Sequence, residues 1–196
     1  MKKVELPSID IAALATDGDR KRTVSDELID AFEEVGFAVL VGHGIEKKLL
    51  SEMRELLIRV FNVPDSIKEE LLISRSNYRG YIPLGFFSPN EKKIFEETKN
   101  DLYEGFKLHW ECPKENPVKG ECLLYGSNKW VKQVENMKET VLSYWKDCDR
   151  LATTLLFHLA IALGVKPAIL LDFFHEPLTN MTLLHYPVSS LSLINI

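Results

Sequence analysis

The segment that decides the fold is Phe32-Glu-Glu-Val-Gly-Phe-Ala-Val-Leu-Val-Gly-His-Gly-Ile45. Before it, apolar residues recur every three or four positions from Val24 onward, which predicts an amphipathic helix with Thr23 at its N-cap. Gly36 is typical of a helix C-terminus. The apolar run 37–41 predicts a short buried strand, which the two glycines around His43 then end.

Working outward from this segment, the patterns predict a mixture of helices and short strands. Residues 74–128 are rich in glycine, proline and aromatic side chains and predict loops with short strands packed on a core. Helices are predicted at 46–61, 67–72, 130–163 and 167–174, and strands at 6–11, 181–186 and 191–196.

Composition excludes several classes of function. The chain has 196 residues, 45% of them hydrophobic and 27% charged, with a formal net charge of −5. An acidic balance argues against a nucleic-acid partner, and the absence of a long apolar run argues against a membrane partner. Three cysteines, an odd number, predict free thiols and a cytoplasmic location.

Four segments in the same order resemble the isopenicillin N synthase-like oxygenases, which depend on non-haem iron(II) and 2-oxoglutarate. They are Leu6-Pro-Ser-Ile-Asp-Ile11, the segment 32–45, a group comprising Tyr78-Arg-Gly-Tyr81, Asp101-Leu-Tyr-Glu-Gly-Phe106 and Leu124-Tyr-Gly-Ser-Asn-Lys-Trp130, and Asn180-Met-Thr-Leu-Leu-His-Tyr-Pro187. Gly42 departs from the family, which usually has Asn there, and we expect this to alter only a local turn.

The resemblance implies an α+β chain corresponding to the N-terminal half of such an enzyme. Residues 1–128 would form the N-terminal dioxygenase region, and residues 129–175 a long support helix with a short one. Residues 176–196 would form the first strands of an incomplete double-stranded β-helix (jelly-roll) barrel. We therefore expect the chain to end before the residues that bind iron in this family.

The family holds iron(II) with two histidines and one carboxylate, the first two ligands in a His-x-Asp pair. None of the five histidines here is followed two residues later by aspartate: His43, His109, His158, His175 and His185. No arginine follows Arg150, so the family's Arg-x-Ser grip on 2-oxoglutarate is missing as well. We therefore predict no catalytic and no metal-binding residue, and no productive binding of Fe(II) or 2-oxoglutarate by this chain.

The resemblance assigns ligand contacts to four residues. Tyr186 would hydrogen-bond the carboxylate of 2-oxoglutarate, and Arg79, Tyr81 and Phe106 would line the substrate pocket. The alternative for Tyr186 is a half-buried strand tyrosine. For Arg79 it is a surface arginine in a loop, with Glu104 as a further candidate partner.

Two histidines have simpler predicted roles. His43 is predicted to cap local backbone with its ring, and His185 to be a packed side chain rather than a ligand. A zinc site at His109, Cys112 and Cys122 is disfavoured, because the paired Cys-x-x-Cys spacing is absent.

Two functions stay open. The first is an oxidoreductase of the iron(II)/2-oxoglutarate class acting on a small-molecule substrate, although the 196-residue chain alone is predicted to be inactive. The second is a non-catalytic truncated product or interaction module derived from such an enzyme. Open barrel strands and the uncharged, β-prone end 191–196 predict self-association.

Overall fold

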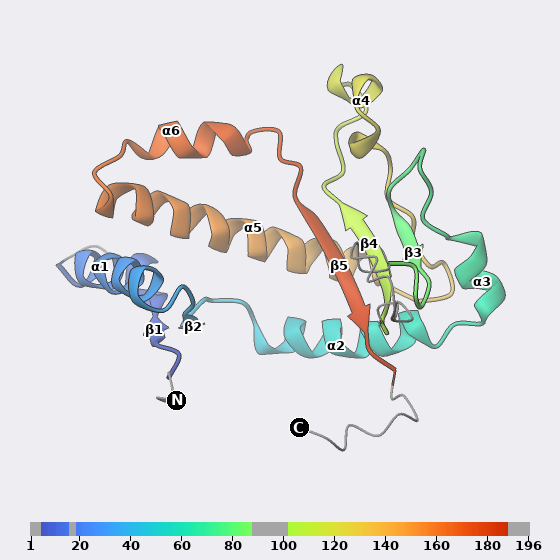
Figure 1. Ribbon diagram of the computed structural model, residues 1–196, viewed down its shortest axis with the longest axis horizontal. Helices are drawn as coiled ribbons and strands as arrows, with labels where there is room; N and C mark the ends of the chain where they lie inside the picture. The colour runs from blue at the N-terminus through green and yellow to red at the C-terminus, as the bar shows by residue number, and fades with distance from the viewer. Residues whose placement is uncertain (1–4, 16–18, 88–101, 188–196) are drawn as a thin grey trace, which may run out of the picture. The chain divides into compact units, whose positions relative to one another are not determined.

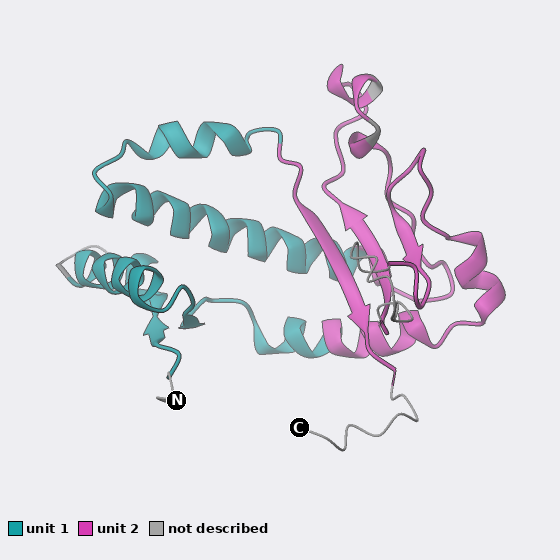
Figure 2. Ribbon diagram, in the orientation of Figure 1, with its two compact units in different colours: residues 1–52, 139–176 teal, residues 53–138, 177–196 magenta. Residues whose placement is uncertain are grey.

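The computed structural model describes residues 5–15, 19–87 and 102–187 (Figure 1). The chain is a mixture of helices and strands, as predicted. It divides into two compact units, residues 1–52 with 139–176 and residues 53–138 with 177–196 (Figure 2). The predicted division at residues 128 and 175 stays a prediction, and the predicted strand 191–196 lies outside the described residues. No helix in the described ranges is long and apolar enough to cross a membrane.

Unit 1 begins with a two-stranded parallel sheet. Strand β1 (Ser8–Asp10) pairs with β2 (Val39–Val41) in the register Ile9 to Leu40, and the 3-10 helix η1 (Ile11–Ala15) follows β1 directly. Helix α1 (Asp19–Glu34) connects the strands. Its apolar stripe packs with β1 and η1 into one core made of Ile9, Ile11, Leu14, Val24, Leu28 and Ala31.

Two details of this region correct the sequence prediction. Helix α1 begins at Asp19, so Thr23 lies inside the helix and is not its N-cap. Strand β2 exists, but Val39 and Val41 are exposed and Phe37 is 70% exposed, so the strand is not buried. The end of α1 is as predicted, since Gly36 has a φ of +83° and donates its N–H to the Ala31 carbonyl.

The turn after β2 explains why Gly42 is a glycine. Its φ is +68°, and an added Cβ would overlap the Asp10 carboxylate oxygen Oδ1. That oxygen already accepts the N–H of Ala12 at 3.0 Å. The departure from Asn therefore involves more than a local turn, because the absent side chain leaves room for the residue that fixes the end of β1.

Four further helices belong wholly or partly to unit 1. Helix α2 (Lys47–Phe61) agrees with the predicted 46–61. Helix α5 (Met137–Ala162) begins seven residues later than predicted, because Asn136 has a φ of +59° and interrupts the turn before it. Helix α6 (Pro167–Leu171) and the 3-10 helix η3 (Asp172–Phe174) follow.

Unit 2 is built on an antiparallel sheet in the order β3-β4-β5. The strands are β3 (Gly80–Ile82), β4 (Glu104–His109) and β5 (Asn180–His185). Tyr81 lies opposite Phe106, and Glu104 lies opposite His185. The central strand is buried on both faces, unlike a sheet with one wet side. Three short helices complete the unit: α3 (Asp65–Glu70), α4 (Val118–Glu121) and η2 (Leu123–Tyr125).

Candidate functional site

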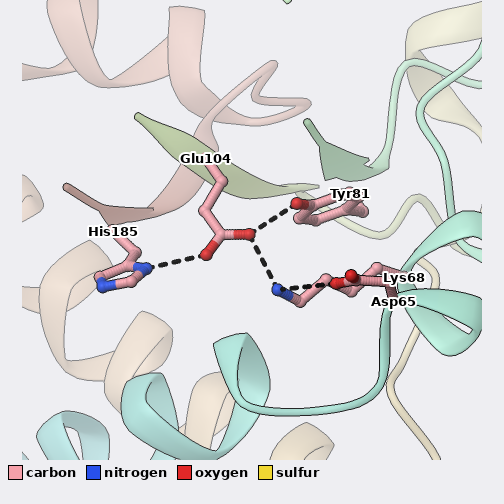
Figure 3. Close-up of polar contacts among 5 residues, drawn as sticks. All are labelled: Asp65, Lys68, Tyr81, Glu104 and His185. Atoms are coloured by element: carbon pink, nitrogen blue, oxygen red, sulfur yellow. Dashed lines mark hydrogen bonds and ion pairs between the residues drawn. The ribbon is translucent and has the colours of Figure 1, made fainter. Parts of the chain in front are cut away.

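A buried carboxylate lies at the start of the central strand of unit 2. Glu104 opens β4, and its side chain is 11% exposed (Figure 3). On the neighbouring strand β5, His185 lies directly opposite Glu104. On the other neighbouring strand, β3, Tyr81 is its diagonal neighbour. Directly opposed and diagonal pairs are the ones whose side chains meet on a sheet. The register therefore gathers two polar rings on one carboxylate.

Three donors share the two oxygens of this carboxylate. The Tyr81 hydroxyl donates to Oε2 at 2.6 Å, and the Lys68 ammonium, from α3, donates to the same oxygen at 3.0 Å. The Nδ1 of His185 lies 2.8 Å from Oε1. Because an ionised carboxylate only accepts, Nδ1 carries the proton in this pair. Figure 3 shows the three contacts converging on Glu104.

The contacts set the charge of the group. Burial by itself raises the pKa of Glu104, but the hydrogen bonds from Tyr81, His185 and Lys68 outweigh it and the pKa is lowered. Burial, followed by the hydrogen bond to Glu104 and its charge, raises the pKa of Tyr81. At neutral pH the cluster therefore holds a carboxylate, an ammonium and a protonated phenol. It can lock the three strands together and hold His185 in one tautomer.

A second polar cluster lies at the other end of β4 and is centred on Asn128. Its side-chain amide donates to the His109 carbonyl at 2.7 Å and accepts a hydrogen bond from the His109 N–H at 2.9 Å. The amide thus forms the same two hydrogen bonds with His109 that the backbone of a neighbouring strand would form. The same amide oxygen accepts Nε of Arg79 at 3.1 Å. Asn128 therefore extends the hydrogen bonding of β4 and anchors Arg79. In the sequence it stood out only as part of a resembling segment.

Arg79 is fully buried, with 0% exposure. Its Nη2 donates to the carbonyl oxygens of Trp110 and Leu124, while its Nη1 has no hydrogen-bond partner among the described residues. Burial lowers its pKa, against the opposing charges of Glu111 and Cys122. The alternative of a surface arginine is wrong. Glu104 is not its hydrogen-bonding partner, because that carboxylate is occupied by Lys68, Tyr81 and His185.

The four residues with predicted ligand contacts are not gathered at one place. Tyr81 contacts Glu104, Phe106 is 1% exposed in the sheet, and Arg79 is buried against Asn128. Tyr186 follows β5, is 66% exposed, and has its ring centroid 5.6 Å from that of Tyr103. The half-buried alternative for Tyr186 is therefore wrong, and its hydroxyl lies on a solvent-facing side chain. All four ligand roles stay predictions.

The contacts of His43 and His185 can be compared with their predicted roles. The Nδ1 of His43 accepts the N–H of Ile45 at 3.0 Å, which confirms the capping role. His185 packs its ring on Phe61, with centroids 5.5 Å apart, while its Nδ1 contacts Glu104. The contact with Glu104 was not foreseen, since a strand pairing across 81 residues leaves no local sequence signal.

One spacing of ligand type was missed in the sequence. His109 is followed two residues later by Glu111, which has the form His-x-Glu. Burial first, and then the charges of Arg79 and Lys107, lower the pKa of His109 to about 4. The same two positive charges disfavour a cation at the ring, and Glu111 accepts the N–H of Asn128 at 3.3 Å. Across the described ranges, no three His, Cys, Asp or Glu side chains gather to hold a metal.

Residues 6–133 match the protein family described as the N-terminal region of the non-haem dioxygenase in morphine synthesis. The chain belongs to this family. The matched region contains both clusters, except for His185, and most of unit 2.

Longer relatives of this dioxygenase family are similar in sequence. A 2-oxoglutarate-dependent dioxygenase (thnC) of Trichoderma harzianum is 28% identical over 194 residues, which covers 97% of this chain and 58% of the relative. A homoarginine-6-hydroxylase of Arabidopsis thaliana is 28% identical over 171 residues, covering 83% and 46%. The chain thus spans about half the length of the curated relatives that it matches.

Two solved structures show the same fold. A 2OG-Fe(II) oxygenase family protein from Caulobacter crescentus superposes with a TM-score of 0.81 at 20% identity, over 96% of this chain and 58% of that one. A full-length Neurospora crassa protein, solved in complex with alpha-KG, gives a TM-score of 0.75 at 20% identity, over 94% and 55%. At this level of identity the likeness shows the fold of the dioxygenase family.

Proposed function

We propose that this chain supplies the N-terminal part of an iron(II)- and 2-oxoglutarate-dependent dioxygenase that oxidises a small organic substrate. The family match over residues 6–133 carries the proposal. The names of the sequence relatives and the fold of the solved structures support it. On this proposal residues 1–128 are the N-terminal region, 129–175 the support helices, and 176–196 the first strands of the barrel.

The sheet of unit 2 supports a barrel that continues beyond these residues. Strand β5 is six residues long and lies at the end of the order β3-β4-β5 in the described part of the chain. An edge strand of this length presents unpaired backbone groups that another strand can use. In the proposed enzyme, the next strand of the double-stranded β-helix would pair with that edge.

The described residues do not fit an iron(II) site. The His109–Glu111 pair lies beside the positive charges of Arg79 and Lys107, and no third ligand joins it in the described ranges. In the proposed enzyme the iron would be held by residues outside the described ranges. This chain would contribute support, through the Glu104 cluster, and Tyr186 as the residue that donates a hydrogen bond to the carboxylate of 2-oxoglutarate.

A chimera tests this proposal. Residues 1–187 of this chain are joined to the barrel of the Trichoderma harzianum relative, and both the chimera and the isolated chain are titrated anaerobically with Fe(II) and 2-oxoglutarate. We expect the visible absorbance of the iron–2-oxoglutarate chelate, and succinate formation in air, from the chimera alone. In the chimera, Tyr186→Phe should weaken 2-oxoglutarate binding about tenfold, the effect of one lost charge-assisted hydrogen bond.

Two outcomes would contradict the proposal at separate points. Chelate absorbance from the isolated chain would show an iron site within these residues. A chimera with native circular dichroism but no chelate would show that this chain is not an exchangeable N-terminal part. Phe32→Tyr, which adds a hydroxyl to an exposed ring on α1, is the matched control for Tyr186→Phe and should leave 2-oxoglutarate binding unchanged.

A further inference from the structure

A cavity of about 380 Å³ lies within unit 1. Its walls are the 3-10 helix η1, the turn Gly42–Gly44, and one face of α5 between Arg150 and His158. This volume is within the range of small-molecule sites, roughly 300–1,000 Å³. Every lining residue belongs to unit 1.

Small residues keep this space open. Ala12 and Ala15 line it from η1, and Gly42 and Gly44 line it from the turn. Both glycines have positive φ, so larger residues are disfavoured there. At Gly44 an added Cβ would lie 3.6 Å from one guanidinium nitrogen of Arg150. The turn backbone and this guanidinium are therefore close together at the cavity wall.

The charge of the cavity comes from Arg150. Its side chain is 53% exposed, and its ion pair with Asp147 is a single contact of 3.6 Å between Nη2 and Oδ1. Such a long, exposed pair contributes little, and the described residues leave most of the guanidinium N–H donors of Arg150 without an acceptor. His158 also lines the cavity and is 5% exposed; burial, and then the charge of Lys21, lowers its pKa. It is therefore neutral near pH 7, and the described lining carries one positive charge.

The remaining polar groups of the lining can donate hydrogen bonds. Because Nδ1 of His43 accepts the Ile45 N–H, the ring carries its proton on Nε2. The hydroxyl of Thr153 is a further potential donor in the lining, whereas that of Thr154 is already donated to the Arg150 carbonyl at 2.9 Å. Donors around one cation suit an acceptor with a single negative charge, and a carboxylate fits the planar guanidinium fork.

The other walls are apolar. Ile11 and Leu14 come from the core of unit 1, and Leu151 and Phe157 come from α5. A ligand that lies along them gains by removing apolar surface from water. An apolar wall with a few polar groups at one side is the usual composition of a small-molecule site.

We propose that this cavity binds a small monocarboxylate with an apolar body, its carboxylate on Arg150 and its apolar part against Leu151 and Phe157. The inference concerns unit 1 alone and does not depend on the proposed oxygenase function. The carboxylate and the neighbouring apolar group could belong to a free apolar acid or to the end of a larger metabolite.

Phenylacetate is a suitable probe, and phenylacetamide is its uncharged match in shape. Each is titrated into the full 196-residue chain, and backbone amide shifts are followed by NMR. We expect phenylacetate to bind with a dissociation constant of about 1 mM or below, shifting the amides of Gly42, His43 and Gly44. Phenylacetamide should bind at least about tenfold more weakly, since it cannot form the charge-assisted pair.

Two variants locate the site. Arg150→Gln should weaken phenylacetate binding about tenfold and leave phenylacetamide binding unchanged, while Arg54→Gln, an exposed arginine on α2, should change neither. Ala12→Phe fills the cavity from an exposed position of η1 and should abolish binding of both probes.

Three results would overturn the inference. They are equal binding of the two probes, unchanged phenylacetate binding in Arg150→Gln, and no saturable shift at about 10 mM phenylacetate. Should Arg150→Gln prove unstable, the comparison of the two probes on the unmodified chain decides the point. Shifts confined to residues outside the cavity also count against it.

Discussion

Replacing Glu104 by Gln tests whether the buried carboxylate holds the sheet of unit 2 together. The Gln side chain has the same shape and keeps one acceptor oxygen, but it cannot compensate the Lys68 ammonium, whose side chain is 11% exposed. Hydrogen bonds to charged groups contribute about 1.5–3 kcal/mol each, and breaking a buried pair costs about 3–5 kcal/mol. Because Gln retains part of the hydrogen bonding, we expect a loss of about 2–3 kcal/mol in the free energy of unfolding.

Urea unfolding followed by circular dichroism measures this loss, with hydrogen exchange of the β4 amides reporting on unit 2 itself. Glu70→Gln, an exposed carboxylate on α3, is the matched control and should change stability by less than about 0.5 kcal/mol. A second signature is dependence on pH. The folded pKa of Glu104 is lowered from 4.5, so its contribution is complete above pH 4.5 and is lost as the pH falls toward the folded pKa. A stability within about 0.5 kcal/mol of the parent protein at neutral pH would refute the reasoning.

Four further outcomes are expected. Arg79→Lys should lower the free energy of unfolding by about 2–4 kcal/mol in urea, because an ammonium cannot satisfy three separated acceptors at once. The pKa of His109 is about 4 in the folded chain and 6.5 in the unfolded chain, so the free energy of unfolding should fall by roughly 2–3 kcal/mol between pH 6.5 and 4. In urea unfolding, His109→Gln should lack this dependence of stability on pH. Gly42→Ala should lower the melting temperature, because alanine is strained at a positive φ and its Cβ would clash with Asp10. Adding Asp10→Ala to this variant should remove the clash and restore part of the melting temperature, but the backbone strain should remain. Size-exclusion chromatography with light scattering should show self-association of the isolated chain.

Each of these has a result that would contradict it. An Arg79→Lys variant as stable as the parent would mean that the three acceptors are met in other ways. An unchanged pH slope in His109→Gln would assign the slope to other groups. If Asp10→Ala does not improve Gly42→Ala, the carboxylate does not restrict that turn. A monodisperse monomer would contradict self-association.

Local patterns predicted the helices and strands well, and their ends less well. Helix α2 agrees with its prediction because both of its ends coincide with breaks in apolar spacing. Helix α5 does not, because Val131 and Val134 are buried in the turns that precede it and continue the helical spacing of Met137, the first residue of the helix. The same apolar periodicity serves a turn and a helix, and Asn136 with its φ of +59° separates them.

The two polar clusters could not be predicted from the sequence, because their contacts join residues that are far apart along the chain. The alternative of a surface position for Arg79 reflected where arginines in loops usually lie, whereas its burial depends on Asn128, 49 residues away. Glu104 was considered as a partner for Arg79, whereas strand register directs it to Tyr81 and His185. Contacts of this kind arise from which strands pair, and no local periodicity encodes that.

The distance along the chain between β4 and β5 has a consequence for how the protein forms. Glu104 and His185 are 81 residues apart, and β5 is the last described strand. On the ribosome, β3, β4 and Lys68 are made well before β5 emerges, so the carboxylate must wait with one side of its strand unpaired. Closing so long a loop is entropically costly and slow. The edge of β4 should therefore be open to chaperone capture in this interval, and pairing with residues 180–185 should cover that edge.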